Sequence, residues 1–138
     1  MSLITKNRIK VELKKHRILL GICVVLTLIV VALPFYDRYK MVSITLEWGR
    51  LAPFPESAKD FSIETEGSMF TRSFRSHFKC TRTEFQKWAD ESPGLKNAHI
   101  EKNGSIEKHN IRPGGGAQGA WVKYDTTTGE VEVYVCWS

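Results

Sequence analysis

Residues 18–35 read ILLGICVVLTLIVVALPF, a run of eighteen residues without a charged side chain. Thirteen of them are Leu, Ile, Val or Phe. Each of these contributes roughly −0.3 to −0.6 kcal/mol to insertion at mid-helix, about −4 to −8 kcal/mol for the run. At about 1.5 Å per residue the helix covers about 27 Å, close to the hydrocarbon thickness of a bilayer. The sequence therefore predicts one transmembrane helix over residues 18–35.

Charge is distributed unevenly about this run. Residues 1–17 hold six of the twenty Lys and Arg residues and one acid, Glu12, whereas the rest of the chain carries equal numbers of acidic and basic side chains. Positive charge favours the cytoplasmic side of a membrane helix, so we expect a cytoplasmic basic head and an extracytoplasmic C-terminus. Because the remainder is neutral, the net charge of +5 does not indicate a nucleic-acid partner.

Two processed forms compete with a permanent anchor. A signal peptidase could cut after Ala32, but the apolar run is longer than a typical signal peptide and Pro34 lies just beyond the cut. A lipoprotein would use Cys23, although Ile22 rather than Gly or Ala precedes it. The sequence favours a single-pass membrane protein in contact with the lipid bilayer.

The rest of the chain suffices for one small domain. Residues 36–54 are expected to form a stalk or short strand and a proline-containing connector, because three apolar residues alternate with polar ones: Val42, Ile44 and Leu46. Pro55 is expected to open a single helical turn that ends near Asp60. We assign residues 55–138 to the extracytoplasmic domain.

A β-hairpin is predicted next. Residues 61–66 alternate, Gly67 and Ser68 supply the turn, and the second strand places four apolar residues on one face: Phe70, Phe74, Phe78 and Cys80. Its other face carries a polar stripe, which we take as a solvated surface with lipid headgroups or an acidic partner as the alternative: Thr71, Ser73, Arg75, His77 and Lys79. Arg72 is an exception on the apolar face.

One helix and four strands complete the domain. Thr81 and Glu84 match a capping box, and the helix should bury Phe85, Trp88 and Ala89. Strands are predicted over four ranges: 99–102, 105–111, 120–124 and 131–137. The order indicates an α+β domain with one antiparallel sheet and a helix packed on one face.

Cys80 and Cys136 are the two cysteines beyond the membrane run, so we expect a disulfide between them to stabilise the domain by about 3 to 4 kcal/mol. Two buried free thiols are the alternative. Strand alternation argues against the disulfide. Cys80 shares the phenylalanine face of its strand, whereas Cys136 lies on the opposite face of its own strand from Val133 and Val135.

Other motifs do not indicate chemistry. The glycines of residues 114–119 formally fit G-x-G-x-x-G, but a strand rather than a helix follows, so no nucleotide is expected. The four histidines lack metal-ligand spacing, so we expect no metal and no cofactor: His16, His77, His99 and His109. A Cys80 nucleophile would need His77 as its base, and these side chains should point to opposite faces.

Three segments follow one another in a distinctive order: LAPFPESAKD at residues 51–60, TEFQKWADESPGL at 83–95 and VEVYVCWS at 131–138. This order resembles small bacterial single-span membrane proteins of unknown function. The resemblance implies an inner-membrane location with a periplasmic domain, and it implies no activity or site residue.

We therefore expect a membrane-anchored, non-enzymatic interaction module with an unknown protein partner. One alternative is an envelope hydrolase whose acid and base come from Glu64, Glu66 and His77. Another is a structural component of a secretion or division complex.

Overall fold

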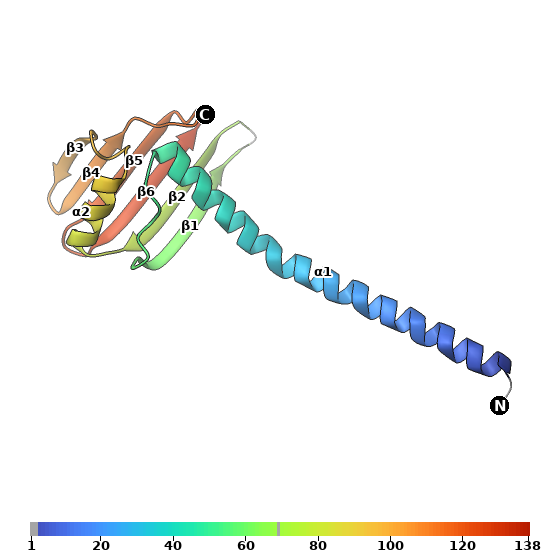
Figure 1. Ribbon diagram of the computed structural model, residues 1–138. Coiled ribbons are helices and arrows are strands. Elements are labelled where there is room, and N and C mark those ends of the chain that lie inside the picture. Colours follow the sequence, from blue (N-terminus) through green and yellow to red (C-terminus); the bar gives the residue numbers. More distant parts are fainter. Residues whose placement is uncertain (1–2, 69) are drawn as a thin grey trace. The chain divides into compact units, whose positions relative to one another are not determined.

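The structure is a computed structural model that describes residues 3–68 and 70–138, with side chains from Lys15 onward (Figure 1). Four basic side chains of the predicted head lie outside the described residues: Lys6, Arg8, Lys10 and Lys14. The contacts divide the chain into two compact units, Met1–Asp37 and Arg38–Ser138.

The first unit is helical. Helix α1 extends over Leu3–Gly49, well beyond the predicted run at both ends. The large apolar side chains between Ile18 and Phe35 are exposed, and this helix near the N-terminus is long and apolar enough to cross a membrane. Pro34 lies inside it, as proline often does in membrane-spanning helices.

The short strand predicted within residues 36–54 is wrong, because α1 continues to Gly49. After Pro34 the sequence contains no proline or glycine before Gly49, so nothing interrupts a helix whose nucleation is already complete. Residues at helical spacing, Met41, Ile44 and Trp48, pack against the core of the domain, and Thr45 is fully buried. The alternating pattern was part of this broader helical face.

The end of α1 is a Schellman-type cap. Arg50 N donates to Glu47 O at 3.1 Å and Leu51 N to Leu46 O at 2.9 Å. Arg50 takes the left-handed conformation of such a cap, with φ of 52°, in the place that glycine usually fills. The cap turns the chain from α1 into the connector towards the sheet.

Six antiparallel strands form one sheet in the spatial order β1-β2-β6-β5-β4-β3. Their bounds are β1 Lys59–Gly67, β2 Arg72–Lys79, β3 His99–Asn103, β4 Ile106–Ile111, β5 Gly119–Asp125 and β6 Glu130–Trp137. The predicted hairpin of β1 and β2 is confirmed, as are the four later strands. The last strand, β6, lies between β2 and β5 and joins the first hairpin to the others.

The core lies on one face of the sheet. Alternate residues of the central strands are buried there, including Phe74, Phe78, Val133 and Val135. Residues 38–49 of α1 and the second helix, α2 (Arg82–Glu91), lie on this covered face (Figure 1). The α+β class is confirmed, with a six-stranded antiparallel sheet.

Helix α2 begins with the predicted capping box. The Thr81 side chain accepts from Glu84 N at 3.3 Å, and Glu84 Oε2 accepts from Thr81 N at 2.8 Å. Phe85, Trp88 and Ala89 are buried as predicted.

Two local predictions are wrong. Phe70 is 75% exposed, because β2 begins only at Arg72 and Phe70 lies in the hairpin turn, where Ser68 N donates to Thr71 O. The single helical turn predicted from Pro55 to Asp60 is also wrong. Ala58 N donates to Pro55 O at 3.0 Å and closes a tight turn, and β1 begins at Lys59.

Candidate functional site

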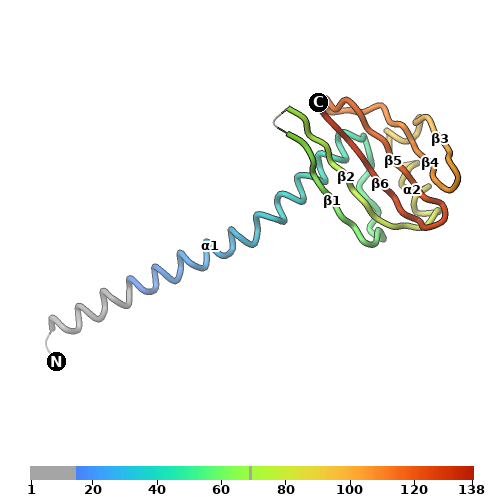
Figure 2. The backbone as a smooth tube through the Cα atoms, turned by 180° about the vertical axis from the view of Figure 1, so that it is seen from behind, coloured from blue at the N-terminus to red at the C-terminus, as the bar shows by residue number. Residues whose placement is uncertain are grey.

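The other face of the sheet, which we call the open face, is not covered by α1 or α2 within the described residues. Figure 2 shows the strands from this side, with α2 behind them. The polar stripe lies here where it belongs to β2, with Ser73, Arg75, His77 and Lys79 in register with the outward residues of β6, whereas Thr71 precedes the strand. Its Ser73 and Arg75 are half-buried and the rest of the stripe is exposed.

An aromatic pair lies at the centre of the open face. Trp121 of β5 and Tyr134 of β6 are partners across the two strands. Their rings stack, with centroids 5.2 Å apart and planes 19° from parallel. Both residues are half-buried although no helix covers them, because each ring shields its neighbour.

Three cations surround these rings. The guanidinium of Arg75 lies 5.1 Å from the centroid of Tyr134, and the ammonium of Lys123 lies 4.2 Å from that of Trp121. Lys108 Nζ lies 5.9 Å from the Trp121 centroid. Such contacts are worth about 0.5 to 1 kcal/mol each at exposed sites.

One carboxylate belongs to this group. Glu132 pairs with Arg75, and with Lys123 Nζ at 3.5 Å. We call these six residues the aromatic–cation cluster: Arg75, Lys108, Trp121, Lys123, Glu132 and Tyr134. It carries three positive charges and one negative charge.

Sequence reasoning identified Arg75 of this cluster and missed the aromatic residues. Trp121 alternates with buried Ala120 and Val122, and Tyr134 with buried Val133 and Val135. An aromatic side chain at an outward position of a strand is the signal that could have indicated the pair. The residues that lie beside such an aromatic side chain on neighbouring strands can be named only once the strand order of the sheet is known.

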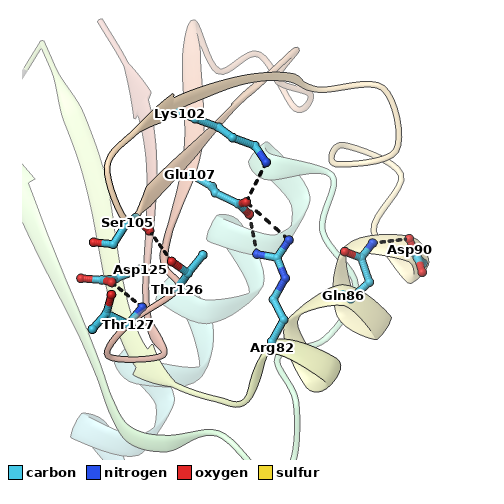
Figure 3. A network of polar contacts seen from close by, with 9 residues as sticks. All are labelled: Arg82, Gln86, Asp90, Lys102, Ser105, Glu107, Asp125, Thr126 and Thr127. Atoms are coloured by element: carbon cyan, nitrogen blue, oxygen red, sulfur yellow. Dashed lines mark hydrogen bonds and ion pairs between the residues drawn. The ribbon is translucent and has the colours of Figure 1, made fainter.

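A second polar group fixes α2 to the sheet (Figure 3). Glu107, on the covered face of β4, is buried and accepts from Arg82 of α2 and from Lys102 Nζ of β3 at 3.1 Å. The hydrogen bond from Arg82 lowers the pKa of Glu107. A buried carboxylate needs such partners, so we read this group as a structural clamp.

Cys80 and His109 are two further buried titratable residues. Burial, and then the charge of Glu84, raises the pKa of Cys80 to about 11, so its thiol stays protonated at neutral pH. Burial lowers the pKa of His109, whose ring meets Phe85 edge-on at 5.5 Å. The Cys80 thiol is therefore a poor nucleophile.

The predicted Cys80–Cys136 disulfide is wrong for a single chain with this fold. Cys136 is the register partner of Ser73, which precedes Cys80 by the whole length of β2. At about 3.3 Å per residue this separates the cysteines by about 23 Å, far beyond the roughly 7 Å limit for their Cα atoms. Both are free, with Cys80 buried and Cys136 half-buried on the open face.

The residues of the hydrolase alternative do not meet in a cavity. Glu64 and Glu66 lie on edge strand β1, exposed on the open face. His77 lines a shallow cavity of about 250 Å³ that contains neither of them. Among the described side chains, no group of three or more His, Cys, Asp or Glu could hold a metal ion.

Comparison with protein-family models, with curated proteins and with solved structures found no match for this chain.

Proposed function

We propose that the chain is a single-pass membrane protein whose extracytoplasmic domain is a non-enzymatic interaction module. In this proposal the aromatic–cation cluster binds an acidic segment of a protein partner. The N-terminal head lies in the cytoplasm, and α1 crosses the bilayer.

Two features support the anchor. The helix is long and apolar enough to cross a membrane, and its large apolar side chains from Ile18 to Phe35 are exposed. The basic residues at positions 1–17 favour a cytoplasmic N-terminus.

The observation that carries the binding role is the cluster itself. Large aromatic side chains and arginine are enriched in protein interfaces, and here they lie on a sheet face without a helix over it. Within the cluster the three cations outnumber Glu132, which favours an acidic ligand. Glu64 and Glu101 border the cluster on its two sides, as the register partners of Arg75 and Lys108. In this proposal the segment runs along β6 and β5, the two central strands, between Glu64 of β1 and Glu101 of β3.

Site-specific photo-crosslinking of the full chain in its own membrane tests this role. A photoreactive amino acid replaces His77, which is exposed on the open face beside Glu132, or Gln86, which is exposed on α2 as the matched control. We expect the probe at position 77 to crosslink one protein through an acidic peptide. The probe at position 86 should not yield that product.

Charge reversal completes the test. Lys108→Glu with Lys123→Glu should abolish the crosslink from position 77, whereas Lys87→Glu with Lys96→Glu, two exposed cations away from the cluster, should preserve it. The attraction is electrostatic, so the complex should also weaken with salt. A crosslinked peptide without acidic residues, or a crosslink that survives the cluster reversal, would contradict the proposal.

A further inference from the structure

A cavity of about 490 Å³ lies on the covered face, where β2 begins and β6 ends. Its lining includes two residues of α1, one from each of the two strands and two loop glycines: Ile44, Trp48, Arg72, Trp137, Gly115 and Gly116. We call it the tryptophan cavity.

Strand alternation shows that this cavity interrupts the core. Arg72 and Trp137 are register partners and share the alternation of the core residues Phe74 and Val135. Those two neighbours are buried, whereas Arg72 is exposed and Trp137 is 44% exposed. Two core-facing positions are thus left open to a ligand.

Arg72 is the only charged residue among the described residues that line the cavity. The Glu47 carboxylate lies next to this lining, with Oε1 3.3 Å from where a Cβ atom on Gly115 would stand. Within the described residues Arg72 has no ion pair, and no side-chain hydrogen bond is recorded for it. The indole N–H of Trp137 likewise has no protein acceptor there, in contrast to Trp88, whose Nε1 donates to Ala52 O at 3.0 Å. The cavity therefore offers donors to an acceptor.

The glycine loop fixes the Trp48 wall. A Cβ atom on Gly115 would lie 2.6 Å from Cδ1 of Trp48, so any larger residue would displace the indole. Gly115 and Gly116 have φ of 59° and 83°, in the region that favours glycine. Close packing on Trp48 therefore explains Gly115 of the triple glycine that resembled a nucleotide motif. Trp48 also contacts Phe74 edge-on at 5.5 Å.

We propose that the tryptophan cavity binds the carboxylate end of an apolar molecule. The carboxylate pairs with Arg72, and the apolar body lies between Trp48 and Trp137. A single guanidinium matches one carboxylate and can bind it through two parallel hydrogen bonds. The volume falls within the roughly 300–1,000 Å³ usual for small-molecule sites, and the lining combines polar residues with the two indoles.

The test uses the full chain in nanodiscs of zwitterionic lipid, which avoids detergent that could fill the cavity. Calorimetric titration compares 4-phenylbutyrate with 4-phenylbutanol, which has the same ring and chain without the charge, and empty nanodiscs supply the baseline. We expect the acid to bind at least tenfold more tightly than the alcohol.

Variants test whether this difference in affinity between the acid and the alcohol arises in the cavity. Arg72→Gln should reduce the affinity of the acid to that of the alcohol, while Arg112→Gln, an exposed arginine outside the cavity lining, should leave it unchanged. Trp137→Ala should weaken both ligands, because it removes an apolar wall. The Lys108 and Lys123 reversal should bind the acid like the wild type, so this test is independent of the proposed partner.

A further titration distinguishes a polypeptide C-terminus from a free acid as the natural carboxylate. The peptide Gly-Gly-Phe with a free C-terminus is compared with its amide and with 4-phenylbutyrate. Tighter binding of the free peptide identifies a polypeptide C-terminus, whereas tighter binding of 4-phenylbutyrate identifies a free acid. Equal affinity for acid and alcohol, an acid affinity unchanged by Arg72→Gln, or no heat of binding at millimolar acid would overturn the proposal.

Discussion

Trp88 is the residue on which the attachment of α2 depends most. It is 3% exposed, and its ring contacts those of Phe54, Phe78 and Phe85. Trp88→Ala should therefore destabilise the domain by about 3 to 5 kcal/mol, measured by urea unfolding. Trp88→Phe is the milder control, since it retains a ring and loses the hydrogen bond to Ala52 O, at a cost of about 1 kcal/mol from that bond. An unfolding midpoint unchanged by Trp88→Ala would refute the packing described for α2.

His109 should make stability depend on pH. The ring is buried, Nε2 has no hydrogen-bond partner among the described residues, and burial lowers its pKa while Glu107 opposes the shift. Because the folded-state pKa lies below the unfolded value of about 6.5, the unfolded state binds more protons below that pH. Stability is thus complete above about pH 6.5 and falls as the pH decreases towards the folded-state pKa.

Paired unfolding measurements on either side of pH 6.5 check this sign. His109→Leu should reduce the loss of stability on acidification. A wild-type domain that becomes more stable between these pH values on acidification would contradict the buried neutral imidazole.

At the scale of elements, the capping box sets the start of α2. Thr81→Ala removes the acceptor for Glu84 N and should cost about 1 kcal/mol, in the usual range for lost caps. Thr81→Ser retains the hydroxyl and should restore most of this stability. Thermal unfolding of the three proteins measures both effects, and an unchanged melting temperature for Thr81→Ala would show that the cap does not limit stability.

The sheet register predicts different reactivity for the two outer thiols. Cys136 is half-buried on the open face, whereas Cys80 is buried with a pKa raised to about 11. A maleimide at neutral pH should therefore modify Cys136 faster than Cys80. The two modification rates should become similar only after the domain unfolds. Peptide mapping by mass spectrometry measures the order. Recovery of a Cys80–Cys136 disulfide from native monomer would contradict the register of β2 and β6.

Sequence patterns predicted the strands and α2 because each of these elements has a buried and an exposed face, and the spacing of apolar and polar residues along the chain shows both. Phe74 and Phe78 alternate, and Thr81 with Glu84 marks the helix start. The extension of α1 was missed because its face over residues 41–48 is recognised only once the sheet beneath it is known. The aromatic–cation cluster and the tryptophan cavity were missed for the same reason, since Trp121 and Tyr134, or Arg72 and Trp137, meet only through strand pairing.

At the scale of the whole molecule, we propose that a single membrane anchor holds the domain on the far side of the bilayer. The charges before the apolar run should set its orientation. Neutral replacement of Lys14, Lys15 and Arg17 should produce a mixture of orientations without changing the folded domain.

A reporter fused after Ser138 tests this claim most directly. An enzyme that is active only after export, alkaline phosphatase, should be active in cells, while a fluorescent protein that matures only in the cytoplasm should remain dark at the same position. Both fusions should stay in the membrane fraction after alkaline extraction. A fluorescent fusion with inactive phosphatase would contradict the proposed topology, and release from the membrane fraction would contradict the anchor.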